Sequence, residues 1–149
     1  MLFVSYALQA LPDKVDDDPG PGRGIVDIYD TDGNFLQRLL TGGVLNAPWG
    51  MALTPGGFGR IPGRFLVGNF GDGRISAFRF ELDGFKLAPV FEGYLGDGKG
   101  RPVVIDGLWA IAFPPNAGGF DSQDLYFTAG PEDEEHGLFG RLEIAEKKH

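Results

Sequence analysis

Short stretches of alternating hydrophobic and polar residues run along this chain, separated by small turn-forming residues. Around Ser76, for example, Ile75 and Ala77 fall on the opposite face. Alternation with a period of two predicts strands in which successive side chains point to opposite sides. The pattern predicts ten strands, over residues 2–6, 24–30, 34–40, 50–53, 65–69, 74–80, 86–95, 108–113, 124–128 and 137–144.

The turns between these strands also have recognisable sequences. Asp32-Gly33 and Asp83-Gly84 each lie between two predicted strands. Both residue types tolerate the positive φ angle of a tight turn, so each pair predicts a β-hairpin. Gly71-Asp72-Gly73 predicts a third tight turn.

The chain repeats itself. PWGMALTP at 48–55 returns as LWAIAFPP at 108–115, which places Trp49 and Trp109 60 residues apart. On the same period, FLVG at 65–68 returns as LYFT at 125–128. A copy also occurs at 2–5, as LFVS. Repeats of this size indicate stacked units, such as propeller blades or solenoid coils.

Four sequential antiparallel strands per repeat favour a β-propeller blade. The parts lie at 2–40, 48–95 and 108–144 of one domain, residues 1–149, and make about two and a half blades of a propeller that has six blades when complete. The first part lacks its innermost strand and the last its outermost, so we expect self-association or further blades to close the ring. Both tryptophans are expected to be buried between blades, and ligand stacking is the less favoured alternative.

Composition supports an all-β fold and narrows the possible partners. The 149 residues include 25 Gly, 11 Pro and 13 Phe, and 42% are apolar, enough for a core. The net charge of −8 argues against nucleic acid, which is bound through clustered Lys and Arg. No stretch approaches the roughly 20 apolar residues of a membrane span. Residues 1–9 lack the features of a signal peptide and are predicted to form a strand.

Several long motifs together resemble a known family. They are GIVDIYD at 24–30, LNAPWGMAL at 45–53, FLVGNFGDGRISAF at 65–78, IDGLWAIAF at 105–113 and LYFTAGPEDEEHGLFG at 125–140. This set resembles an uncharacterised family of exported bacterial β-propellers with NHL-like repeats, some of which carry a PEP-CTERM sorting signal. The chain is similar to the C-terminal portion of that family. The resemblance implies an extracellular or periplasmic location and brings no assigned reaction.

Propeller topology is expected to place many acidic residues on one face. Loops that lead into an innermost strand, and loops that join the second and third strands, emerge together in such a fold. Ten of the 21 acidic residues lie in these loops: Asp13, Asp16, Asp17, Asp18, Asp72, Asp106 and residues 132–135. They predict either a solvated acidic surface or a binding face for a protein or glycan.

Four residues of this face are candidate metal ligands. Asn46 and Asp106 each lie three residues before a repeated tryptophan, and Asn69 and Asp72 end or follow a second strand. Hard cations such as Ca²⁺ take carboxylate and carbonyl oxygens as ligands, so calcium is the possible cofactor. Turn chemistry explains Asn and Asp at these positions equally well.

Two function classes remain open. The first is a non-catalytic binding or scaffold module that uses the acidic face. The alternative is a metal-dependent hydrolase of the lactonase-like propeller type, with Asn46, Asn69 and Asp106 as ligands and Asp72 as general base. No serine has the context of a catalytic triad, and a lone His136 favours a surface role, so the sequence favours the non-enzymatic reading.

Overall fold

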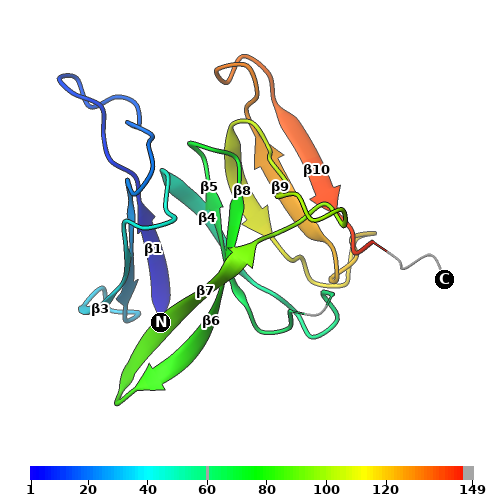
Figure 1. Ribbon diagram of the computed structural model, residues 1–149, viewed down its shortest axis with the longest axis horizontal. Helices are drawn as coiled ribbons and strands as arrows, with labels where there is room; N and C mark the ends of the chain where they lie inside the picture. The colour runs from blue at the N-terminus through cyan, green and yellow to red at the C-terminus, as the bar shows by residue number, and fades with distance from the viewer. Residues whose placement is uncertain (60, 146–149) are drawn as a thin grey trace.

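The protein is an all-β structure of three antiparallel sheets. A computed structural model describes residues 1–59 and 61–145, and these residues contain no helix. The strands are β1 (Leu2–Tyr6), β2 (Ile25–Tyr29), β3 (Phe35–Thr41), β4 (Pro48–Leu53), β5 (Phe65–Asn69), β6 (Ile75–Asp83), β7 (Lys86–Tyr94), β8 (Leu108–Ala112), β9 (Leu125–Ala129) and β10 (Leu138–Leu142). Their orders are β1-β2-β3, β4-β5-β6-β7 and β8-β9-β10, so neighbours in sequence are neighbours in each sheet (Figure 1).

All ten predicted strands are confirmed, and the largest difference is at β6. This strand continues three residues beyond the predicted end because its pairing with β7 extends to Asp83 and Lys86. The two-residue connection begins with Gly84 at a φ of 62°, as the predicted hairpin turn requires. Gly33, at a φ of 85°, likewise confirms the turn between β2 and β3.

The core lies on both faces of the central four-stranded sheet. Every residue of β5 is buried. Phe65 and Val67 pack with the first sheet, in a cluster that includes Val26 and Ile28. Leu66, between them in sequence, packs with the third sheet. Alternation along one strand therefore supplies two separate hydrophobic contacts, and the central sheet is the layer that holds the other two together.

The first strands of the sheets lie side by side. β4 contacts both β1 and β8. The contact with β8 is a close backbone approach, since a Cβ atom added at Gly50 would lie 2.6 Å from the amide nitrogen of Ile111. The glycine in this repeat phrase therefore allows two strands of different sheets to meet.

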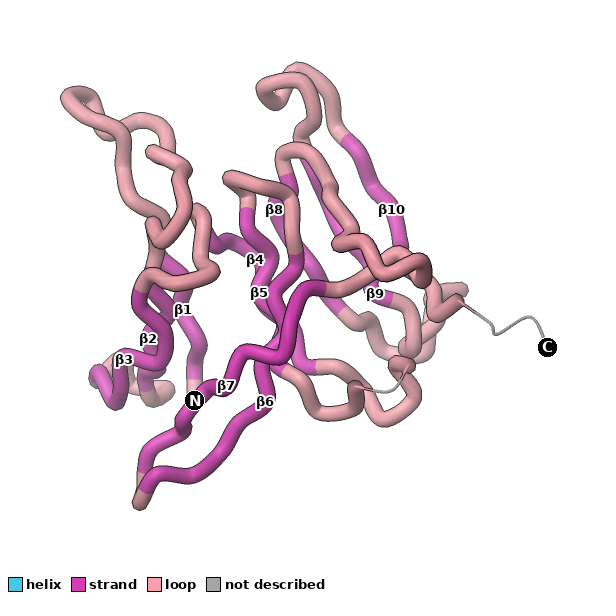
Figure 2. The backbone as a smooth tube through the Cα atoms, in the orientation of Figure 1, coloured by secondary structure: helices cyan, strands magenta, loops and turns pink. Residues whose placement is uncertain are grey.

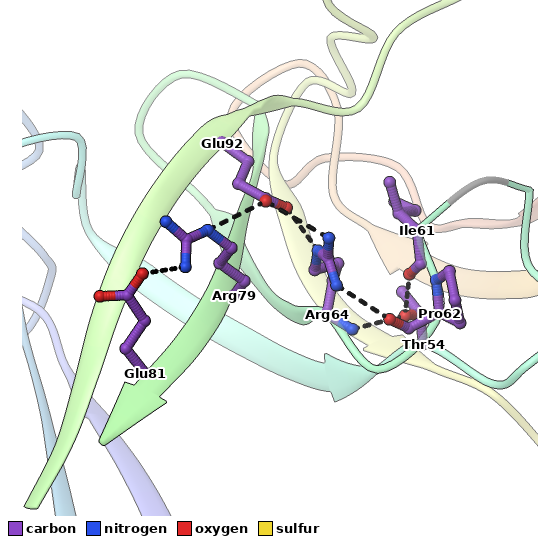
Figure 3. A network of polar contacts seen from close by, with 7 residues as sticks. All are labelled: Thr54, Ile61, Pro62, Arg64, Arg79, Glu81 and Glu92. Carbon is purple, nitrogen blue, oxygen red and sulfur yellow. Dashed lines mark hydrogen bonds and ion pairs between the residues drawn. The ribbon is translucent and has the colours of Figure 1, made fainter.

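A polar network fastens the β4–β5 connection to β6 and β7 of the central sheet (Figure 3). Arg64 forms two hydrogen bonds with Glu92 of β7, and Arg79 of β6 also lies 3.4 Å from Glu92. At the other end, the amide of Arg64 donates to the hydroxyl of Thr54 at 2.8 Å. The network holds the connection in place on the side away from the loops described below.

The β1–β2 and β9–β10 connections extend from the same end of the molecule, the upper end in Figures 1 and 2. The β6–β7 hairpin extends from the opposite end. Within residues 1–59 and 61–145 the three sheets do not close into a ring. The same residues contain no helix that is long and apolar enough to cross a membrane.

Candidate functional site

The two repeated tryptophans are less buried than expected. Trp49 is 44% exposed, and Trp109 is half-buried. The prediction of burial between sheets is therefore wrong for Trp49. Trp49 lies at the start of β4, where an irregularity between Pro48 and Met51 interrupts the pairing with β5, so simple alternation does not set the direction of its side chain. The indole stacks on Phe70, with ring centroids 5.6 Å apart.

Asn46 and Trp49 together hold the long β1–β2 connection. The side-chain oxygen of Asn46 accepts a hydrogen bond from the amide of Gly20 at 2.7 Å. The indole N–H of Trp49 donates to the Asp17 carboxylate at 2.6 Å. Two residues that are three apart in the repeat thus fasten two points of one acidic loop.

Asp106 and Trp109 do the same for the β9–β10 connection. The Asp106 carboxylate accepts a hydrogen bond from the amide of Glu132 at 3.1 Å. The indole N–H of Trp109 donates to the Glu134 carboxylate at 2.6 Å. The sequence repeat therefore repeats a structural device, in which a polar residue and a tryptophan anchor an acidic loop.

The anchored β9–β10 loop has an unusual backbone. Glu132, Asp133 and Glu134 are three consecutive residues with positive φ, at 57°, 54° and 67°. Such a left-handed turn costs roughly 1–2 kcal/mol per residue for non-glycine types. Strain of this kind persists where surrounding contacts determine it, and the bonds from Asp106 and Trp109 are those contacts here.

The anchored loops and the tryptophans surround two pockets that share Asp17 and Trp49. The strand pocket, of about 760 Å³, lies between the adjoining ends of β1, β4 and β8 and reaches Trp109. The loop pocket, of about 500 Å³, lies between the two acidic loops and is lined by Asp16, Asp17, Asp133 and Glu134, together with Val15, Trp49 and Phe70. Acidic residues more than 100 positions apart in sequence thus line one pocket.

Tyr6, which lines the strand pocket, is paired with a second phenol. The hydroxyl groups of Tyr6 and Tyr29 lie 3.0 Å apart and share a hydrogen bond. This bond raises the pKa of Tyr29 above its ordinary value of 10.0.

Of the four predicted metal ligands, the structure brings Asn46 and Asn69 together. The backbone amide of Asn46 donates to the side-chain oxygen of Asn69 at 2.9 Å. The side-chain NH₂ group of Asn69 in turn donates to the hydroxyl of Ser76 at 3.1 Å. Asp72 accepts a hydrogen bond from the amide of Arg74 at 3.1 Å, as in a tight turn. Asp106 anchors the β9–β10 loop as described.

A side-chain oxygen of each of the four predicted ligands therefore already accepts a hydrogen bond from a backbone amide of the protein. In residues 1–59 and 61–145, no three His, Asp or Glu side chains are grouped so that they could hold a metal ion. The calcium site stays a prediction. His136, predicted to have a surface role, lies 3.3 Å from Glu132 and is exposed.

Sequence reasoning missed Phe70 and the roles of Asp17 and Glu134 as indole acceptors. The signal that was available is the recurrence of an Asn or Asp three residues before each Trp. Which loop residue each tryptophan reaches could not be predicted, because the two loops differ in length and backbone conformation.

The chain was compared with known proteins. No family model and no solved structure matches it. Three uncharacterized proteins of Acanthamoeba polyphaga mimivirus are similar in sequence. One is 40% identical over 122 residues, which make up 82% of this chain and 30% of the viral protein. Another is 36% identical over 141 residues, 95% of this chain and 32% of that protein. The third is 34% identical over 110 residues, 74% of this chain and 19% of that protein.

These relatives correct the expected family. The similar sequences are viral, and no family model connects the chain to bacterial NHL-repeat propellers, so that assignment was wrong. The expected extracellular or periplasmic location rested on it and loses its support. The chain spans about a third of the length of the first two relatives. Its function must therefore be argued from the site itself.

Proposed function

We propose that this chain is a section of a β-propeller that acts as a non-catalytic binding module, with its ligand at the two pockets beside Trp49. The propeller part of the proposal is supported by sheet order and packing. Each sheet is sequential and antiparallel, consecutive sheets pack face to face, and β4 lies against β1 and β8. Blades around a central axis have this arrangement.

One observation carries the binding part. Trp49 is exposed in a pocket where three sheets meet, yet hydrogen bonding and stacking hold its ring in place. A large aromatic ring fixed at an open pocket is a typical anchor for a partner, because it offers much contact area at a small cost in conformational entropy. The strained turn at 132–134 also lies beside the pockets, and Asn46 and Asp106 hold the two loops there by hydrogen bonds to loop amides.

Binding arrays of glycans and peptides test the proposal. The purified chain should bind at least one ligand class, and Trp49→Leu should lose that binding. Phe85→Leu is the matched control, because Phe85 is fully exposed at the β6–β7 hairpin, away from the pockets. Thermal melts establish that both variants are folded.

Two results would overturn this function. One is that no array ligand depends on Trp49. The other is calcium-dependent hydrolysis of a lactone that Asp106→Ala abolishes, which would establish the hydrolase alternative instead.

A further inference from the structure

The strand pocket and the loop pocket differ in lining but adjoin at Trp49 and Asp17, which line both. The strand pocket contributes two indole rings, Trp49 and Trp109. The loop pocket contributes four carboxylates and the ring of Phe70. A ligand that enters beside Trp49 therefore meets aromatic surface and negative charge together.

The tryptophan rings are oriented by the carboxylates. Each indole N–H donates to a carboxylate at 2.6 Å, Trp49 to Asp17 and Trp109 to Glu134. A hydrogen bond to an anion increases the electron density of the indole ring, and the ring face is the part that attracts a cation. The contacts that hold the rings thus also strengthen their attraction for positive charge.

The negative charge at the pockets is not compensated from within the described part of the chain. Neither pocket is lined by a Lys, Arg or His side chain among residues 1–59 and 61–145. The nearby basic side chains contact other acids: Arg23 pairs with Asp18, and His136 lies 3.3 Å from Glu132. In the same residues, the four carboxylates of the loop pocket have no ion-pair partner.

The chemistry of this lining selects among cations. A hard divalent ion takes six to eight oxygen ligands and gains nothing from indole faces. Anions are repelled, and a purely apolar ligand would desolvate the carboxylates without pairing them. An alkylammonium or guanidinium group satisfies both parts of the lining, since it stacks on aromatic rings and hydrogen-bonds to carboxylates.

We propose that Trp49, Trp109 and the surrounding carboxylates form a binding site for an organic cation that presents an alkylammonium or guanidinium group. This inference rests on the proposed binding function and names its ligand class. The group comes either from a free polyamine or from a basic side chain of a peptide. The left-handed turn at 132–134 serves to bring Asp133 and Glu134 to the site.

Isothermal titration calorimetry on the full chain tests the proposal, because its signal does not depend on the tryptophans. The probes are spermidine, a peptide that contains Arg and Lys, fully acetylated spermidine as the uncharged match, and CaCl₂, all at one ionic strength. Spermidine, the basic peptide or both should bind saturably, and the acetylated compound should not. The response to the two probes tells whether the group comes from a polyamine or a peptide.

The variants separate charge from shape. Asp17→Asn and Glu134→Gln keep an oxygen that can accept the indole hydrogen bond but remove the charge, so each should weaken cation binding about fivefold. Asp83→Asn makes the same charge change at the distant β6–β7 turn and should leave affinity unchanged. Trp49→Leu should weaken binding about tenfold, and Trp49→Phe should restore part of it.

Three outcomes would overturn the inference. They are no binding of either organic cation, binding that Asp83→Asn weakens as much as Asp17→Asn, and binding of Ca²⁺ alone. If the arrays identify a neutral ligand that depends on Trp49 while the organic cations fail to bind, the binding function stands and only the cation assignment falls.

Discussion

At the residue scale, Trp49 is more important for the pocket than for the core. Its indole is fixed by Asp17 and Phe70 while nearly half of its surface remains open. Leu125, by contrast, is fully buried between the second and third sheets. Replacing a side chain buried in the core should destabilise the fold, whereas replacing a side chain exposed at the pocket should mainly remove a binding surface.

We expect Trp49→Ala to lower the free energy of unfolding by about 2 kcal/mol, less than the 3–5 kcal/mol typical of a buried aromatic residue, because part of the ring is already in water. Leu125→Ala should cost about 2–5 kcal/mol, since it leaves a cavity in the core. Urea denaturation of both variants checks the order. A larger loss for Trp49→Ala would contradict the surface assignment.

Asp30 makes the stability of the β2–β3 hairpin sensitive to acid. Its carboxylate accepts hydrogen bonds from the Asn34 side chain and from the amides of Asn34 and Asp32. Led by the Asn34 side-chain bond, these bonds lower the pKa of Asp30 below its ordinary value of 3.8. The bonded carboxylate therefore stabilises the folded state above pH 3.8, and this contribution is lost as the pH falls through the lower pKa of the folded protein.

Chemical denaturation at a series of pH values below 5 tests this sign. The wild type should lose stability as the pH falls in this range. Asp30→Asn should be less stable at pH 7 and should show a smaller loss on acidification, because it has no carboxylate to protonate at that turn. Equal acid dependence in the two proteins would show that other carboxylates are responsible.

At the element scale, the close approach of β4 and β8 decides how the second and third sheets meet. Gly50 lies against the backbone of Ile111, and Gly68 of β5 lies against the side chain of Leu108. Backbone cannot move aside as a flexible side chain can, so the first of these contacts tolerates least change. The pocket beside Trp49 depends on it, because β4 and β8 supply both tryptophans.

Gly50→Ala should therefore destabilise the protein by about 1–3 kcal/mol and disturb the tryptophan environment. Gly56→Ala is the matched control, because an added Cβ at Gly56 meets nothing within 4 Å. Thermal unfolding followed by tryptophan fluorescence measures both effects. Similar melting curves for the two variants would contradict the close approach of the strands.

At the scale of the whole molecule, the three sheets leave strand edges open within the part of the chain that the structure describes, residues 1–59 and 61–145. β10 ends the third sheet, and its Leu138 and Phe139 side chains are 46% and 63% exposed. Open edges with apolar side chains favour pairing with another chain. The proposed propeller has the same consequence, since an incomplete ring must be completed by further blades or by a second copy.

We expect the isolated chain to self-associate at micromolar concentration. Phe139→Lys should shift it toward the monomer, because a lysine on an edge strand opposes strand pairing. Phe85→Lys makes the same change at the β6–β7 hairpin and should have little effect. Sedimentation velocity distinguishes these cases, and a wild type that remains a stable monomer would contradict the expectation.

Much of the fold could be predicted because its signals are local. Alternation located all ten strands, and the Asp-Gly pairs located two hairpins, since strand faces and positive φ angles depend on adjacent residues. The repeat around Trp49 and Trp109 also identified Asn46 and Asp106 as special positions. Their hydrogen bonds to loop amides show why these positions are polar.

The sequence by itself determined the all-β class, the order of the strands and the acidic character of the loops, because each depends on side-chain type and short-range pattern. Only the tertiary structure decided that Trp49 faces a pocket rather than the core, and that Asp17 and Glu134 bond the two indoles. The physical reason is that both outcomes depend on how separate sheets pack and on the conformation of long loops. The left-handed turn at 132–134 contains no glycine, so no residue type in it indicates the positive φ angles.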